Sequence, residues 1–239
     1  MESQTTQQEF ILVANLIWEY NNLVVDEPVD LGDLEHLAES ATFAIKIKHD
    51  SNSEISECGF FLAKFDDEYD GSFSPLKDYE RVLWLANNYP GYGLSIRQVY
   101  EVTGQVDGHD GIRLIDFGRE ERTDIFSGAS IEILSGDATG ESVVISNYNP
   151  ANQVFTLASD FSTTVRNANY KIVIDKELFF KTGQGADYNT MIPLIYKGGV
   201  IERLDEANIT LQLRIPKFAQ SAGNFLFDLD MQFTSLEEE

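Results

Sequence analysis

Four short runs of apolar and β-branched residues follow one another at a spacing of about ten residues. This pattern constrains the fold of the chain more than any other feature, and the runs occupy residues 131–134, 143–146, 154–157 and 170–174. Polar turns separate them, and we expect Gly136 and Gly140 to adopt positive φ in the first turn. Short strands at this spacing are typical of a small antiparallel barrel or sandwich. The segment therefore predicts a compact β module.

The two chain ends carry longer alternating runs. Residues 42–48 place Phe43, Ile45 and Ile47 on one face, and residues 209–215 and 225–233 alternate in the same way near the C-terminus. These strands need partners to cover their apolar faces. We therefore expect an immunoglobulin-like antiparallel sandwich built from residues 1–66 and 179–239, with residues 67–178 inserted as a small β-barrel-like module. The chain as a whole has 43% apolar and 12% aromatic residues, which is typical of a globular protein.

One short helix is predicted near residues 75–88. Ser74 is a suitable N-cap and Pro75 suits the first helical position, while Pro90 ends the pattern. The apolar residues between them recur every three or four positions, at Leu76, Tyr79, Val82, Leu83 and Ala86.

The charge of the chain is strongly acidic. There are 17 basic and 40 acidic residues, which gives a net charge of −23. Such a chain is repelled by a phosphate backbone and by an anionic membrane, so we expect neither nucleic acid nor a membrane as a partner. The charge is explained either by solubility at high local concentration or by attraction to a basic partner or to cations.

Motifs for catalysis or for metal binding are weak. The sequence has no Gly-x-Ser-x-Gly elbow, no P-loop and no Gly-x-Gly-x-x-Gly. Cys58 is the only cysteine, and we expect it to be a buried residue of a strand. His36, His49 and His109 lack ligand spacing and are predicted to lie at the surface or in turns.

Two acidic loops offer oxygen ligands. Residues 66–71 resemble the start of a calcium loop, but Lys77 occupies the twelfth position, where a bidentate Glu is needed. Residues 107–111 contain two Asp-Gly pairs, which are common in plain turns. Among 40 acidic residues no carboxylate pair of a glycosidase can be singled out. We predict a protein that is not an enzyme, with no catalytic residue, cofactor or metal.

Aromatic residues crowd the segment around the predicted helix. They are Phe73, Tyr79, Trp84, Tyr89, Tyr92 and Tyr100. We expect Tyr79 and Trp84 to bury the helix against a sheet. Tyr89 and Tyr92, which flank Pro90, are better candidates for contact with a sugar or a neighbouring subunit, and Phe73 is a third candidate.

The region 126–174 resembles a small β module that recurs in structural proteins of tailed bacteriophages, especially tail, neck and fibre-associated components. The similarity lies in residues 126–128, 131–136, 140–142, 145–148, 155–157 and 169–172. Where the module commonly has Gly-Gln-Ser-Arg, this chain has Gly140-Glu-Ser-Val143, so it lacks the basic residue. The segments 213–216 and 223–227 are similar to the end of an immunoglobulin-like sandwich of virion surfaces.

The resemblance implies a structural role in a virion rather than a chemical one. We expect an oligomeric tail, neck or fibre-attachment protein, made in the host cytoplasm, whose partners are copies of itself and other virion proteins. A capsid decoration protein is the nearest variant. A carbohydrate-binding module for host glycans is the alternative from another class, and a polysaccharide-cleaving enzyme ranks third.

Overall fold

Antiparallel strands dominate the computed structural model, which describes residues 16–24, 41–49, 54–63, 75–182, 191–214 and 228–235. The mainly β fold with one α-helix agrees with the sequence-based expectation. The elements are β1 (Leu16–Tyr20), β2 (Leu23–Val24), β3 (Ala41–His49), β4 (Ile55–Ala63), α1 (Pro75–Asn88), β5 (Gly93–Gln105), β6 (Gly108–Asp110), β7 (Arg113–Ile115), β8 (Ser130–Ile133), β9 (Ser142–Asn149), β10 (Val154–Leu157), β11 (Asn169–Phe179), β12 (Ile192–Pro193), the 3₁₀ turn η1 (Tyr196–Gly198), β13 (Glu206–Arg214) and β14 (Asp228–Ser235).

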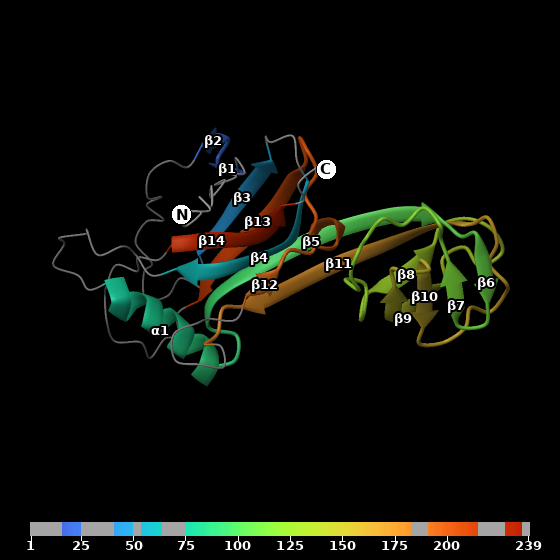
Figure 1. Cartoon of the computed structure of the whole chain (residues 1–239). Coiled ribbons are helices and arrows are strands. Elements are labelled where there is room, and N and C mark those ends of the chain that lie inside the picture. Colours follow the sequence, from blue (N-terminus) through green and yellow to red (C-terminus); the bar gives the residue numbers. More distant parts are fainter. Residues whose placement is uncertain are drawn as a thin grey trace, which may run out of the picture.

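The strands in the described part of the chain form two sheets. An 11-stranded sheet has the order β2-β1-β3-β13-β5-β11-β8-β9-β10-β7-β6, and a 3-stranded sheet has the order β12-β4-β14. All pairs within them are antiparallel. In Figure 1 the molecule is elongated, with one lobe at each end of the long β5 and β11 strands.

The first lobe, here called the sandwich lobe, is built from both ends of the chain, as the alternating sequences predicted. Strand β3 pairs with β13, and β4 pairs with β14. The small sheet lies over the β3, β13 and β5 part of the large sheet, and α1 lies beside them (Figure 1). Its core includes Phe43, Ile47, Ile55, Phe60, Val82, Leu83, Leu94, Ile96, Phe180 and Ile209.

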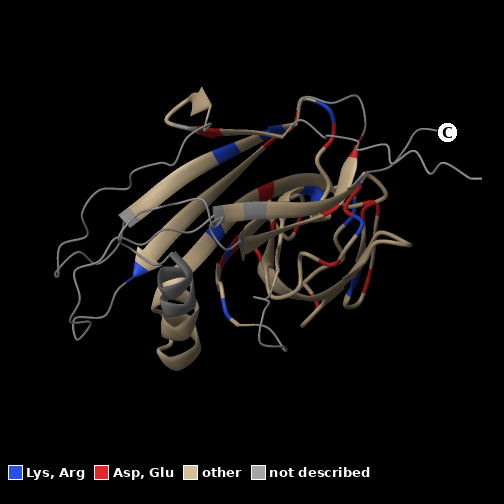
Figure 2. Cartoon of the chain, turned by 60° about the vertical axis from the view of Figure 1, so that its left-hand side comes forward, with Lys and Arg blue, Asp and Glu red and all other residues tan. Residues whose placement is uncertain are grey.

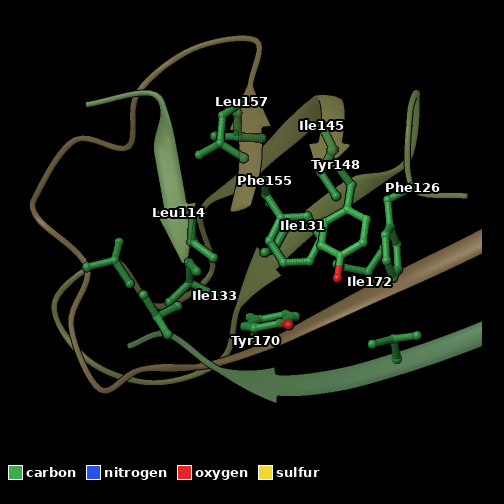
Figure 3. Close-up of a cluster of buried hydrophobic side chains, with 14 of the residues drawn as sticks. Leu114, Phe126, Ile131, Ile133, Ile145, Tyr148, Phe155, Leu157, Tyr170 and Ile172 are labelled. Carbon is green, nitrogen blue, oxygen red and sulfur yellow. The ribbon is translucent and has the colours of Figure 1, made fainter. Parts of the chain in front are cut away.

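The second lobe, here called the distal lobe, contains β6 to β10 and the far ends of β5 and β11 (Figure 1). Its core is rich in aromatic rings, and Phe126, Tyr148 and Phe155 contact one another with centroids 4.9 to 5.2 Å apart. Figure 3 shows these rings gathered with Ile131, Ile145 and Leu157 between the strands. The four runs of the opening pattern correspond to β8, β9, β10 and the first half of β11.

A two-stranded ribbon joins the lobes. Strands β5 and β11 pair continuously from Gln105↔Asn169 to Ser95↔Phe179. At one end β5 also pairs with β13, up to Arg97, and at the other end β11 also pairs with β8, up to Val173. Strand β5 therefore contributes side chains to both cores, Ile96 to the sandwich lobe and Val102 to the distal lobe, while β11 contributes Ile172 to the distal core and leads directly into Phe180 of the sandwich core.

Details of the inserted region differ from expectation. The sheet does not close into a barrel in the described part of the chain. Residues 108–110, expected to form a turn, are strand β6, and the turn falls at Gly111 and Ile112 instead. The reason is the pairing of His109 with Leu114, which extends the hairpin by three residues. Gly136 and Gly140 adopt positive φ as expected, both at 85°.

The helix packs on the sandwich lobe. Val82 and Leu83 of α1 belong to the same core as Leu94 at the start of β5. The core of the distal lobe begins further along β5, at Val102. The division into residues 1–66 with 179–239 and an insert of residues 67–178 stays a prediction.

Candidate functional site

An exposed aromatic surface lies at the C-terminal end of α1. Trp84 is 52% exposed, and its ring meets the Tyr89 ring edge to face, with centroids 5.4 Å apart and an interplanar angle of 69°. Tyr92 follows in the next turn and is 37% exposed. We call Trp84, Tyr89 and Tyr92 the aromatic surface.

Local chain geometry fixes this surface. Pro90 disfavours the helical conformation at Tyr89, so α1 ends at Asn88. The side-chain amides of Asn87 and Asn88 donate back to the carbonyl oxygens four residues earlier, those of Leu83 and Trp84, both at 2.8 Å. The chain then turns back, and the Tyr92 N–H donates to the Tyr89 carbonyl at 3.2 Å.

The aromatic surface carries no charge. The segment from Val82 to Tyr92 contains no Asp, Glu, Lys or Arg. Figure 2 shows the described half of α1 entirely in tan, whereas the loops of the rest of the molecule carry many charges. An uncharged aromatic area on a chain with a net charge of −23 is a marked departure from the rest of its surface.

Two of the three predicted interface residues, Tyr89 and Tyr92, lie together in this surface. Phe73 and the side chain of Tyr79 lie outside the described residues. The expectation that Trp84 is buried was wrong. Val82, Leu83 and Ala86 face the core, and position 84 lies on the opposite side of the helix. The apolar periodicity already left out position 84, and that was the signal for its exposure.

A second notable site is a buried polar cluster beside the ribbon. The loop 116–126, which follows β7, contacts the ribbon and the segment 193–199 of the sandwich lobe, and we call this region the waist. Asp116 is 3% exposed and its Oδ2 accepts a hydrogen bond from the Tyr170 hydroxyl at 2.5 Å. Its Oδ1 accepts from the Gly118 N–H at 2.7 Å. Arg119 Nε lies 3.2 Å from Asp116 Oδ2.

Glu121 is the second buried carboxylate of this cluster, at 6% exposure. Burial and the negative charge of Glu121 raise the pKa of both Tyr100 and Tyr148 to about 12. Burial and the hydrogen bond to Asp116 also raise the pKa of Tyr170. In Figure 3 the hydroxyl oxygens of Tyr148 and Tyr170 lie on the side of the core next to the ribbon. The three tyrosines are therefore neutral groups around a charged centre.

Contacts across the waist hold the lobes together. Gln98 of β5 is buried, donates to the Pro193 carbonyl at 2.9 Å and accepts from the Ile195 N–H at 2.8 Å. Thr123 donates to the Gly198 carbonyl at 3.2 Å. Arg122 Nη1 lies 2.6 Å from Glu54 Oε1. Three elements of the sandwich lobe thus meet the ribbon and the loop.

The histidines differ from the sequence-based expectation. His49 of β3 and the side chain of His109 in β6 are buried, at 1% and 2% exposure, and His36 lies outside the described residues. His109 Nδ1 accepts from the Val165 N–H at 3.1 Å, and Nε2 lies 3.1 Å from Asp160 Oδ1. Both histidines belong to strands that have one buried face. The sequence of residues 108–110 did not indicate that they form such a strand. His109 therefore ties the edge strand to the loop 160–165.

Other candidates offer little chemistry. Cys58 is buried in β4, as expected, and burial raises the pKa of its thiol to about 12, which suppresses the reactive thiolate. Asp107 accepts from the Phe117 N–H at 2.7 Å and so stabilises the β6–β7 hairpin. Among the described residues no three His, Cys, Asp or Glu side chains are grouped as a metal site requires. The acidic loop 66–71 lies outside that part of the chain.

Comparisons with known proteins add no relative. No family model matches the chain, and no curated protein or solved structure matches it significantly. No helix in the described part of the chain combines the length and the apolar character that crossing a membrane requires.

Proposed function

We propose that this protein is a structural component of a tailed-phage virion: an oligomeric tail, neck or fibre-attachment protein that acts through contacts with neighbouring subunits. The aromatic surface is the observation that carries this proposal. Trp and Tyr are enriched in protein interfaces, where they bury a large area with few rotatable bonds. Trp84 exposes 52% of its surface beside Tyr89, in an area without charge.

The braced two-lobed shape supports the same role. A subunit of an assembly has to present its contact surfaces at a fixed separation. The ribbon and the waist contacts of Gln98, Thr123 and Arg122 hold the lobes in one arrangement. The sequence resemblance of residues 126–174 to a phage β module is the reason for choosing a virion over other assemblies.

The test uses the phage that encodes the chain. The protein is quantified by mass spectrometry in purified particles, and the purified protein is studied by light scattering over a range of concentrations. We expect a fixed copy number per particle and a homo-oligomer in solution. Trp84→Ala combined with Tyr92→Ala should weaken self-association by at least about tenfold, because each removes a central interface ring.

The matched control is Ile112→Ala, which changes an apolar side chain of similar exposure, 47%, at the far tip of the distal lobe. It should associate as the wild type does. A protein that is absent from particles and monomeric at every concentration would overturn the proposal. A copy number equal to that of the major capsid protein would support the variant in which the protein decorates the capsid.

A glycan-binding function is the second candidate, and the exposed Trp84 ring favours it. Sugar rings stack on exposed aromatic faces, and the amides of Asn87 and Asn88 lie one turn further along the same helix. A glycan array followed by calorimetry tests this candidate. Binding that is lost in Trp84→Ala, Tyr89→Ala and Tyr92→Ala, and kept in Ile112→Ala, would support it. An array without any bound glycan would reject it.

A further inference from the structure

A polar pocket of about 340 Å³ opens at the waist, between β5 and the loop 116–121. This volume is near the lower end for ligand sites, so the pocket suits a single side chain or a small molecule. Its lining includes Tyr100, Glu101, Arg119, Glu120, Glu121 and Lys197.

Several charges around this pocket already have partners. Lys197 Nζ lies 2.9 Å from Glu202 Oε2 and 2.8 Å from Asp205 Oδ2. Glu101 lies 2.8 Å from Lys171 Nζ. The Arg119 guanidinium lies 3.2 Å from Asp116 and donates to the Thr103 carbonyl at 3.2 Å. These groups have limited capacity for a further ligand.

Glu121 is different. Its side chain is 5% exposed, and Oε1 has only a loose contact with Arg119 Nη1, at 3.6 Å. Oε2 is buried without a hydrogen-bond partner in the described structure. A buried carboxylate oxygen without a donor is costly, so a donor from outside the chain would gain binding energy there.

The electrostatics of the cluster indicate the kind of donor. Asp116 and Glu121 are two buried carboxylates that share one guanidinium, that of Arg119, so a negative charge is left over. Glu101 and Glu120 add carboxylates at the pocket wall, which disfavours an anion. The Tyr100 ring supplies an aromatic wall that suits a cation. The described residues contain no three-carboxylate group of the kind that a hard metal ion needs.

We propose that the waist pocket binds an alkylammonium or alkylguanidinium group, which donates hydrogen bonds to the Glu121 carboxylate while its aliphatic stem lies along Tyr100. The cation comes either from a free amine such as a diamine or from a Lys or Arg side chain of a partner protein. This site lies at the waist rather than at the aromatic surface, and it does not depend on the place of the protein in a virion.

The experiment is a titration of the ¹⁵N-labelled full chain followed by NMR. The probes are putrescine, acetyl-lysine methylamide and acetyl-arginine methylamide, with acetyl-norleucine methylamide as the neutral match. We expect saturable shifts of the amide signals of Tyr100 and of residues 118–121 with the cationic probes only. Tighter binding of putrescine would identify a free amine as the ligand, and tighter binding of a residue derivative would identify a protein side chain.

Two variants test the role of the carboxylate. Glu121→Gln should weaken binding by at least about tenfold, because the charge and one acceptor are lost. Glu132→Gln makes the same change of charge on the exposed face of β8 and should bind as the wild type does. Should Glu121→Gln fail to fold, Glu120→Gln at the pocket wall gives a second test, with a loss of about two- to threefold.

The proposal fails if no cationic probe gives saturable shifts at the waist, if acetyl-norleucine methylamide shifts the same signals, or if a folded Glu121→Gln binds as tightly as the wild type. If Glu120→Gln is the only variant that folds, wild-type affinity in that variant would also contradict the proposal.

Discussion

The hydrogen bond between Tyr170 and Asp116 limits what the neighbouring position can hold. Gly104 of β5 pairs with Tyr170 of β11. A Cβ at position 104 would collide with Asp116 Oδ2 and come within 2.5 Å of the Tyr170 hydroxyl oxygen. Glycine is therefore required here by space, since the φ of Gly104 is not positive.

Gly104→Ala is expected to lower the free energy of unfolding by ~1–3 kcal/mol, because either the buried hydrogen bond or the strand has to move. Urea denaturation measures the change. Gly108→Ala is the control, since a Cβ there meets Ile115 at an ordinary 3.4 Å. Equal stability of the two variants would show that the site relaxes without cost.

The Tyr148 hydroxyl leads to a prediction about alkaline pH. It is buried without a hydrogen-bond partner, and its pKa is raised to about 12 by burial and by Glu121. The unfolded chain loses the Tyr148 proton near the ordinary pKa of about 10. The stabilisation of the folded state that comes from the raised pKa is therefore fully present below pH 10 and is lost as pH rises towards 12. Tyr148→Phe should therefore lose less stability than the wild type between pH 9 and pH 12 in urea titrations. Parallel curves would contradict this.

At the scale of elements, the ribbon is more than a connection, because its inner face is held by polar contacts with the sandwich lobe. Gln98 provides two of them, to Pro193 and Ile195. The outer face is exposed and alternates apolar and charged side chains, with Val99 and Val173 near the ion pair of Arg97 and Asp175. Only the inner face is therefore sensitive to single substitutions.

Gln98→Ala is expected to destabilise the protein by ~1–3 kcal/mol, because it leaves the buried Ile195 N–H without its acceptor and the Pro193 carbonyl without its donor. Gln105→Ala, in the same strand but exposed, should change stability by less than ~0.5 kcal/mol. Chemical denaturation of both variants separates the two cases. A small effect at both positions would mean that the waist opens easily to water.

Local periodicity predicted the helix and most of the longer strands, but not strand β6. It placed α1 at residues 75–88, and it identified the runs 209–215 and 225–233, which overlap β13 and β14, as partners for the strands before residue 66. It did not predict that β5 and β11 extend through the waist, because a strand end depends on its neighbours. The cluster of Asp116, Arg119 and Tyr170 was missed for a similar reason, since Tyr170 and Asp116 are 54 residues apart in sequence.

At the scale of the whole molecule, two cores are joined by strands common to both, so we expect them to unfold together. The two tryptophans, Trp18 and Trp84, lie in the sandwich lobe, whereas the distal core holds Tyr148 and Tyr170. Tryptophan fluorescence therefore reports on the sandwich lobe, and the resolved NMR signals of the Tyr148 and Tyr170 rings report on the distal lobe. Their urea transitions should coincide in the wild type.

A variant with Gln98→Ala and Arg122→Ala should separate these two transitions, because it removes polar contacts at the waist without shortening an apolar side chain of either core. The control carries Gln105→Ala and Arg113→Ala, which alters the distal lobe surface only. Separate transitions in the wild type itself would show that the waist contributes little to cooperativity.

The course of β5 and β11 also determines how the molecule bears mechanical tension. A force that separates the lobes acts along the two covalent backbones of β5 and β11, which lie side by side. The hydrogen bonds between these strands are perpendicular to the force and carry little of it. The force is then transmitted to the pairing of β5 with β13 and to the pairing of β11 with β8, where the strands must slide past one another before they separate. Stretching should therefore detach whole strands at these two pairings while the ribbon between the lobes keeps its length.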